Sequence, residues 1–225
     1  MAFAVLTQEC AMRNLLELRC WPGPQGLLGV DIGATAVRVI ELVRLRGALA
    51  CRHYGVAVLP ALPPGASCHE HDLAALASAI AGARQASGSR ACRAALAMPA
   101  DSLITQTLRL PAGLPDEQLE ILVELEAAQY MPFAVDDACL DFCLLGPGPS
   151  SVGAVSEVDV LLVAARRASV MQLVEVAAAA GLQAVAIDSD ALARQAAIKQ
   201  GGWRSVADGE AVQVAWGLAL HGLTP

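Results

Sequence analysis

The sequence predicts an α/β protein, in which a sheet built from closely spaced strands carries helices and is interrupted by a smaller α+β unit. Apolar residues make up 56% of the 225 residues and charged residues only 16%, which supplies a large core and excludes intrinsic disorder. Aromatic residues are only 4%, and Ala, Val and Leu dominate the apolar set. Small aliphatic side chains favour helices packed closely on a sheet over an aromatic-rich binding module.

The first hundred residues follow a β-β-β-α-β order. We expect these elements at Leu27–Ile32, Val37–Arg44, Leu49–Leu59, Asp72–Gly88 and Cys92–Met98. The first strand is apolar throughout, as a strand buried on both faces would be. Arg46-Gly47 suits a hairpin turn between the second and third strands. Three meandering strands, a crossover helix and a parallel strand describe half of an actin-like, ribonuclease-H-type core.

The pattern changes after residue 100. We expect a strand, a helix and two further strands at Leu103–Leu110, Pro115–Tyr130, Ala138–Leu145 and Glu157–Ala165. Alternating side chains in the first of these segments favour an antiparallel strand, so the four elements make a small α+β subdomain. The chain then returns to the first sheet through a helix, a strand and a second helix, at Ser169–Ala180, Ala184–Asp188 and Asp190–Gln200.

These elements divide the chain into four parts. The leader, which we expect to form a short amphipathic helix or to lack fixed structure, precedes a core that is split by the insertion and followed by a short tail. In residue numbers these parts are the leader at 1–25, the core at 26–99 and 166–200, the insertion at 100–165 and the tail at 201–225.

Charge and hydropathy exclude several classes of function. Lys and Arg total 15 against 22 Asp and Glu, a formal charge of −7, whereas a surface that binds nucleic acid is basic. Mean hydropathy is +0.51, yet the most apolar stretch, residues 168–187, contains Glu175 and Gly181, so we expect no membrane span. The N-terminus lacks the basic start of a signal peptide, and the seven cysteines include no C-x-x-C pair. We therefore expect a cytoplasmic protein.

The segment with the most candidate ligand-binding residues runs from the first expected strand into the second. Asp31 lies at the end of that strand, and the turn through Gly33, Ala34 and Thr35 can present backbone N–H groups to an anion. Gly33 lets a phosphate approach without a Cβ, and Thr35 adds a hydroxyl donor. Asp31 can hold a hydrated Mg²⁺, and Arg38 can reach a phosphate as a fork of donors. The alternative is an ordinary tight turn between two strands.

A second candidate site lies at the end of the helix expected in the insertion. Glu124 and Glu126 belong to a run of carboxylates that can meet a basic residue of a partner, or that forms only a solvated helix face. Tyr130, Met131 and Phe133 follow as an apolar cluster around the helix-ending Pro132. They either pack in the core of the insertion or line a groove for a partner's peptide tail.

The remaining motifs give weaker evidence for a functional site. Cys68-His69-Glu70-His71 contains metal-ligand residue types, but adjacent residues in a Pro-rich loop do not converge easily on one ion, so we expect no metal site. The sequence contains no G-x-S-x-G, H-E-x-x-H or Walker string, which leaves hydrolase and P-loop functions without support.

Strings that agree in order along the chain resemble the type IV pilus assembly protein PilM family, which is related to the bacterial cell-division protein FtsA and to actin. The resemblance extends from Gly26 to about Gln195, and Trp216–Leu220 is similar to the family's closing "GLALR" segment. The matching strings are Leu28–Gly33 with Val37-Arg38, Ala97–Ala100, Ile104-Thr105, Leu108–Pro111, Glu124–Phe133, Leu140–Phe142, Leu145–Pro147, Val158–Ala165 and Ala186–Asp188.

The resemblance implies a cytoplasmic actin-like protein that binds ATP between two lobes and docks the cytoplasmic tail of an inner-membrane partner, PilN, within the type IV pilus machine. It places Asp31, Gly33, Ala34 and Thr35 in the first phosphate loop, with Arg38 where the family usually has Lys. The insertion corresponds to an extra subdomain, and the groove for the tail lies between it and the core.

The sequence departs from the family between the helix after Asp188 and the closing segment, where the family carries a second lobe with a second phosphate loop. We expect weak or lost binding of Mg-ATP and no hydrolysis, because each missing charge-assisted hydrogen bond costs ~1.5–3 kcal/mol. Trp203 and Trp216 in the short tail are then expected to leave apolar surface exposed and to promote self-association. The competing hypotheses are an actin-superfamily ATPase or phosphotransferase, and a non-functional truncated remnant.

Overall fold

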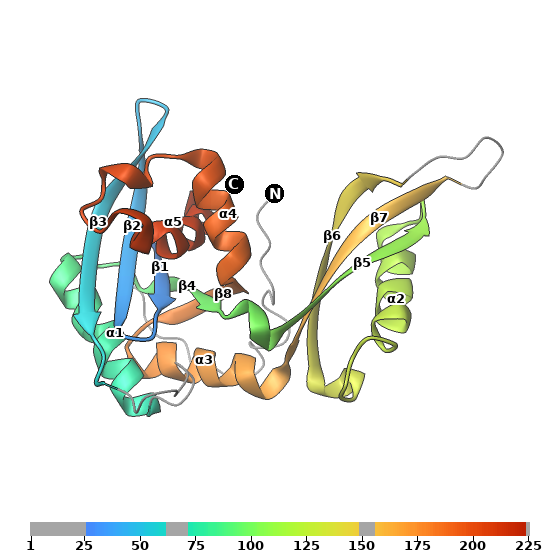
Figure 1. The fold of residues 1–225 in the computed structure, drawn as a ribbon, viewed down its shortest axis with the longest axis horizontal. Helices are drawn as coiled ribbons and strands as arrows, with labels where there is room; N and C mark the ends of the chain where they lie inside the picture. The colour runs from blue at the N-terminus through green and yellow to red at the C-terminus, as the bar shows by residue number, and fades with distance from the viewer. Residues whose placement is uncertain (1–25, 62–71, 149–155, 224–225) are drawn as a thin grey trace.

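A computed structural model describes residues 26–61, 72–148 and 156–223 of the chain. Figure 1 shows a core of one sheet with helices on both faces, and a smaller sheet with one helix that extends from it. The two are joined where β4 leads into β5 and where β7 leads into α3. The expected leader and the Cys68–His71 motif lie outside the described residues.

The core sheet has the strand order β3-β2-β1-β4-β8. Its strands are β1 Leu27–Ile32, β2 Ala36–Leu45, β3 Ala48–Val58, β4 Arg93–Met98 and β8 Gln183–Ser189. β2 pairs antiparallel with β1 and β3, whereas β4 lies parallel to β1 and to β8. Arg46 and Gly47, with φ of 50° and 85°, form the β2–β3 turn, because such a turn needs positive φ at both positions. The predicted β-β-β-α-β core is confirmed.

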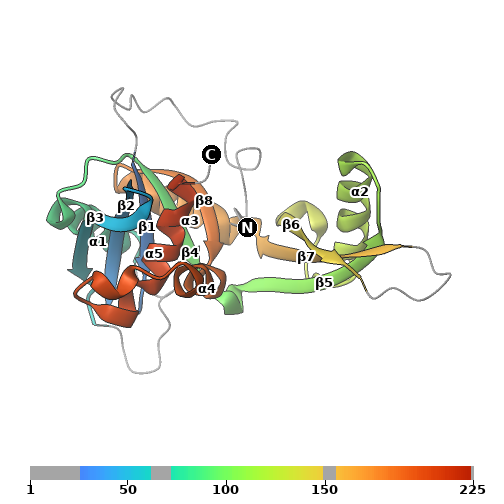
Figure 2. The same ribbon diagram turned by 90° about the horizontal axis from the view of Figure 1, so that it is seen from above.

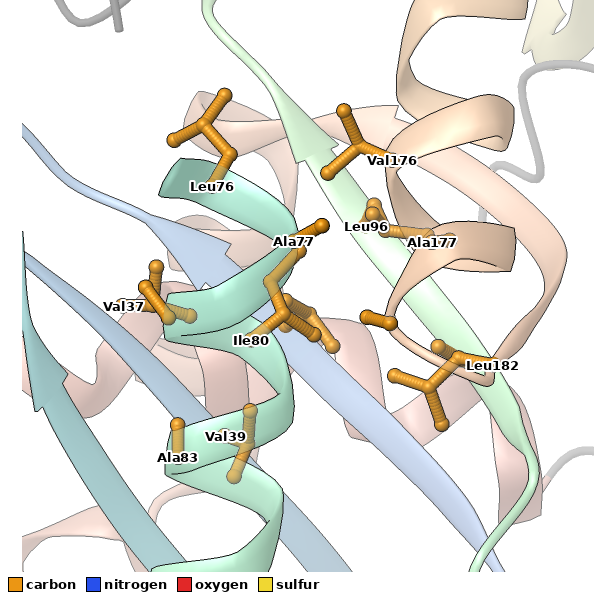
Figure 3. Packing of buried hydrophobic residues seen from close by; sticks show 14 of the residues in the cluster. Val37, Val39, Leu76, Ala77, Ile80, Ala83, Leu96, Val176, Ala177 and Leu182 are labelled. Atoms are coloured by element: carbon orange, nitrogen blue, oxygen red, sulfur yellow. The ribbon is translucent and has the colours of Figure 1, made fainter. Parts of the chain in front are cut away.

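Helices α1 (Leu73–Ser87) and α3 (Arg167–Ala179) cover the first face of this sheet. Their apolar stripes meet alternate residues of the strands, and Figure 3 shows Ile80 and Val176 pointing toward Leu96 of β4. The cluster contains only aliphatic side chains, many of them Ala, so helix and sheet approach closely. This is the packing that the Ala-rich composition predicts.

The second face is covered by α4 (Asp190–Gln200) and α5 (Gln213–Ala219), together with three short 3₁₀ turns at Trp203–Ser205, Gly209–Val212 and Leu220–Leu223. Helix α5 lies directly on β1, because a Cβ at Gly29 would come within 1.9 Å of the Ala215 carbonyl oxygen. It crosses α4 equally closely, since a Cβ at Gly217 would lie 1.8 Å from the Ala193 carbonyl oxygen. The tail residues are thus an integral layer of the core.

The expectation that the two tail tryptophans leave exposed apolar surface is wrong. Trp216 is fully buried and Trp203 is 6% exposed, both in a cluster with Ile40 and Leu42 of β2. The reason is that α5 supplies the cover which the second face of a two-faced sheet requires. Sequence reasoning assigned that cover to a missing lobe.

The insertion is a three-stranded antiparallel sheet of order β5-β7-β6, with α2 on one face. Its elements are a 3₁₀ turn at Ala100–Ser102, β5 Leu103–Pro111, α2 Asp116–Ala127, a 3₁₀ turn at Val135–Asp137, β6 Ala138–Pro147 and β7 Glu157–Arg166. Leu119, Val123 and Ala127 of α2 pack on Leu108 and Leu162 of the sheet. The helix ends three residues before the predicted Tyr130.

The α/β class with an inserted α+β subdomain is confirmed. In the described part of the chain, no helix combines the length and hydropathy needed to cross a bilayer.

Candidate functional site at the strand ends

Three charged side chains lie in one row across the second face of the core sheet, near the ends of β1 and β8. Arg38 of β2 is the register partner of Asp31 of β1, and Asp188 of β8 is the partner of Ala97 of β4. Val30 pairs with Leu96, which places Ala97 beside Asp31. Because alternate residues of a strand share a face, Arg38, Asp31 and Asp188 all face the side that α4 and α5 cover. The sheet thus brings Arg38 to Asp31, as the predicted phosphate turn requires.

Burial controls the charge of Asp31. It raises the pKa of this carboxyl to about 6, while the nearby Arg38 and Arg194 guanidinium groups oppose the shift and Asp190 adds to it. Arg194 and Asp190 both belong to α4. The start of α4 therefore contributes to this site, although sequence reasoning assigned it no role.

The turn from β1 to β2 is held by its own backbone hydrogen bonds. The Gly33 N–H donates to the Ala36 carbonyl at 3.1 Å, and the Leu59 N–H donates to the Thr35 carbonyl at 2.8 Å. Ala34 and Thr35 are exposed at its tip. A Cβ at Gly33 would lie 3.2 Å from the Ala36 carbonyl oxygen and 3.6 Å from Nη1 of Arg38, so the guanidinium lies beside the turn.

Arg38 is paired with a residue of the C-terminal segment. Its Nε lies 3.7 Å from Oδ2 of Asp208, and the Tyr54 hydroxyl donates a hydrogen bond to the same oxygen. Burial raises the pKa of Tyr54, and the hydrogen bond to Asp208 and its charge act in the same direction. Within the described residues, Nε of Arg38 is buried and has no hydrogen-bond partner.

Asp188 is paired with the same segment. Nε2 of His221 lies 2.9 Å from Oδ2 of Asp188, with both side chains less than a tenth exposed. The other carboxylate oxygen accepts the Ser189 N–H at 2.7 Å. Asp190, two residues further on, accepts the Ala100 N–H at 2.9 Å and so joins the start of α4 to the start of the insertion.

These contacts decide whether the predicted phosphate site fits a nucleotide. Two of the predicted phosphate ligands, Arg38 and the Gly33 N–H, already contact Asp208 and the Ala36 carbonyl, whereas Ala34 and Thr35 are exposed at the tip of the turn. Asp188 is paired with His221. These contacts within the chain oppose a resident nucleotide in this arrangement. Across the described ranges, no cluster of three or more His, Cys, Asp or Glu side chains is suited to hold a metal ion.

The predicted partner-binding residues are not brought to one surface. Glu124 is exposed on α2, and Glu126 accepts a hydrogen bond from Gln129. Met131 packs on the cluster between α2 and the sheet, which is the core-packing alternative. Tyr130 is 44% exposed, and Phe133 lies under the guanidinium of Arg166, 4.4 Å from the ring centre.

The sheet face opposite α2 carries a different set of residues. Thr105, Val163 and Asp141 form one cross-strand row, and α2 lies on the side of this sheet away from the core (Figures 1 and 2). Burial raises the pKa of Asp141 to about 6, the Phe142 N–H opposes the shift, and Asp188 of the core adds to it. Asp141 is therefore close enough to Asp188 for their charges to interact.

Sequence reasoning assigned no role to Tyr54, Asp141, Asp188, Asp208 or His221. An acidic residue between apolar strand positions, as at Asp141 and Asp188, is a signal that could have found two of them. Asp208 and His221 carry no local signal, because their partners lie far away in the sequence.

The fold and this site define an actin-like α/β protein with an inserted α+β subdomain. The chain belongs to the family of the type IV pilus assembly protein PilM, whose model matches residues 29–220.

Two solved structures are similar to the chain. One is described as a PilM–PilN type IV pilus biogenesis complex, with 27% sequence identity and a TM-score of 0.62 over 75% of this chain. The match covers 48% of that chain, so this protein spans about half its length. The other is the cytoplasmic domain of EpsL, an inner-membrane component of the type II secretion system of Vibrio cholerae. Its identity is 16% and its TM-score 0.47, over 75% of this chain and 59% of that one.

Proposed function

We propose that this protein is a non-catalytic scaffold of type IV pilus assembly that binds the cytoplasmic tail of a PilN-like inner-membrane protein. The observation that carries the proposal is the family match over residues 29–220, together with the structural similarity to a PilM–PilN complex. Such a scaffold is cytoplasmic, is held at the inner membrane through its partner, and joins that partner to other pilus assembly proteins. The insertion lies at one end of the core, as an interaction module would.

For the tail we propose the face of the insertion sheet opposite α2, near its junction with the core. Asp141 supplies a carboxylate there whose pKa is raised by burial and further by the charge of the nearby Asp188. A Lys or Arg side chain of the tail would oppose this shift, because an opposite charge favours the ionised carboxylate. Thr105 and Thr107 of β5, which lies across β7 from Asp141, are exposed and offer hydroxyl groups to an extended peptide.

The residues predicted from the sequence mark an alternative binding region around the end of α2, although they do not share one surface. Glu124, Glu126 and Tyr130 lie on or just beyond α2, and Phe133 follows in the connection to β6. Met131 would contribute there by supporting this end of the helix. This region and the face opposite α2 are different parts of the insertion and can be tested separately.

Nucleotide enters the proposal only as a weak or absent ligand. Asp31, Gly33, Ala34, Thr35 and Arg38 lie together, but the contacts of Arg38 and Gly33 oppose phosphate binding. We therefore propose that partner binding is independent of Mg-ATP and that the chain hydrolyses none.

Isothermal titration of the chain with a peptide of the partner's cytoplasmic tail tests the proposal. Binding at about micromolar affinity, about −8 kcal/mol, is expected, with the same affinity with and without Mg-ATP. Asp141→Asn should weaken binding, and Glu124→Gln is the matched control because it removes one carboxylate charge from the other surface. Weaker binding by Glu124→Gln together with unchanged binding by Asp141→Asn would instead place the site on α2.

Absence of binding by a chain that unfolds cooperatively would overturn the proposal. Nucleotide turnover that is lost in Asp31→Ala would instead identify an actin-superfamily ATPase or phosphotransferase.

A further inference from the structure

Two donors of the core sheet converge on one oxygen atom. The buried Nε of Arg38 and the Tyr54 hydroxyl, on neighbouring strands, both approach Oδ2 of Asp208. An oxygen that lies between a guanidinium and a hydroxyl donor is the arrangement in which proteins bind phosphate or carboxylate anions. The carboxylate that occupies this position belongs to the chain itself.

The segment that carries Asp208 is held in place by its own packing. Trp203, Val206 and Val212, which flank Asp208, are buried against the second face of the sheet. The Ala211 N–H donates to the Asp208 carbonyl at 3.2 Å, and the Gly209 N–H donates to the Val206 carbonyl at 3.2 Å. These contacts bring the carboxylate to Arg38 as part of folding, so no separate entropy of association opposes the pairing.

The other end of the segment makes an equivalent contact. His221 reaches Asp188 in the same row of charged strand positions, and its side chain is 9% exposed. Between these two contacts, α5 lies on β1 through Gly29. The segment from Trp203 to Leu223 therefore contacts a charged strand residue at both ends of the row.

We propose that Asp208 acts as a built-in anion ligand of Arg38 and Tyr54, so that residues 203–223 close this edge of the sheet and exclude phosphate-bearing ligands. The contact is intramolecular, and a free anion must displace a tethered carboxylate to bind. The closed site explains the poor fit of a nucleotide and does not depend on the partner-binding proposal.

Asp208→Asn tests the inference, with inorganic phosphate as the probe. The amide keeps the size of the side chain and can still accept a hydrogen bond from the Tyr54 hydroxyl. It removes the negative charge that Asp208 places beside Arg38. The melting temperature of the variant should rise with phosphate concentration, because a ligand that binds only the folded state stabilises it. The wild-type chain should respond about two- to fivefold more weakly or not at all, since an ion pair of partly exposed side chains such as Arg38 and Asp208 is worth ~0.2–1 kcal/mol.

Three variants make the result specific. Asp159→Asn is the matched control, because Asp159 also pairs with an arginine, Arg109 at 3.1 Å, and its variant should not gain a phosphate response. The double variant Asp208→Asn/Arg38→Gln should lose the response. Asp208→Ser also removes the carboxylate and leaves Arg38 and Tyr54 in place, so it should gain a phosphate response and serves if Asp208→Asn does not fold.

Two outcomes would overturn the inference. One is an equal phosphate response of wild type and Asp208→Asn. The other is the absence of a phosphate response in every folded variant that retains Arg38. Partner-tail binding is measured separately, so its failure leaves this result unaffected.

Discussion

The two faces of the core sheet are built from the same strands but carry different chemistry. The face under α1 and α3 is lined mainly by aliphatic side chains, and its buried Glu41 accepts a hydrogen bond from the Ser89 hydroxyl. The face under α4 and α5 holds two tryptophans and the charged row of Arg38, Asp31 and Asp188. The first is covered by α1 and α3, which directly precede β4 and β8 in the sequence, and the second is completed by the C-terminal segment. Stability of the first face therefore depends on nearby sequence, and that of the second on a distant segment.

Among the substitutions that test this comparison, Trp216→Ala should have the largest effect on stability. We expect the free energy of unfolding to fall by ~3–5 kcal/mol, because removing a fully buried indole leaves a cavity. Urea unfolding followed by circular dichroism measures it. Ile80→Ala on the first face is the comparison and should cost ~2–5 kcal/mol. A loss below ~1 kcal/mol for Trp216→Ala alone would mean that the second face is not part of the cooperative unit.

The next largest effect is expected for Gly29→Ala, whose free energy of unfolding should fall by ~2–3 kcal/mol. Its Cβ would meet the backbone of α5 at Ala215 and Ala219, so the helix must move off β1. Gly82→Ala is the matched control, because its Cβ meets only the Ala57 side chain at 3.6 Å inside helix α1. That variant should be unchanged or more stable by ~0.5–1 kcal/mol. Equal losses in thermal unfolding would argue against close packing of α5.

Asp31→Asn tests whether the buried charge of Asp31 lowers the stability of the second face. The folded-state pKa of Asp31, about 6, lies above its ordinary value of 3.8, so the folded chain binds this proton more tightly. Its stabilising contribution is present at low pH and is lost as the pH rises from about 4 to about 6. At pH 7 Asp31→Asn should be more stable than wild type by ~1–2 kcal/mol, after allowance for screening, and equal to it near pH 4. Denaturant unfolding at pH 4 and pH 7 measures this difference. A stability difference between Asp31→Asn and wild type that is the same at both pH values would contradict the prediction.

The smallest effect is expected in the insertion, for Arg109→Ala. Arg109 pairs with Asp159 at 3.1 Å and with Glu157 at 3.7 Å, but its side chain is half exposed. The loss should be ~0.2–1 kcal/mol and should shrink at high salt. Chemical denaturation at low and high ionic strength measures it, and a loss that salt does not change would show that packing of the arginine stem dominates.

Local pattern was sufficient for most of the fold. Apolar runs and helical spacing predicted the strands and helices in order, since each depends on periodicity within a few residues. The turn at Arg46-Gly47 followed from residue type alone. The end of α2 was placed three residues late, because Tyr130 continues the apolar pattern although the helix has already given way to a turn.

The candidate site was predicted in part. Asp31, Gly33, Thr35 and Arg38 lie together because one hairpin carries them all. Asp208 approaches Arg38 across 170 residues of sequence, and no spacing rule connects them. The predicted residues around α2 were drawn from one continuous stretch, and a helix distributes such a stretch over several faces.

The sequence by itself determined the α/β class, the order of the elements and the family, because these depend on local periodicity and on strings that keep their order. Only the tertiary structure decided that the tail is a layer of the core and that Asp208 and His221 contact Arg38 and Asp188. The physical reason is that burial and charge pairing depend on which surfaces meet. For the second face, that meeting is made possible by the missing side chains of Gly29 and Gly217.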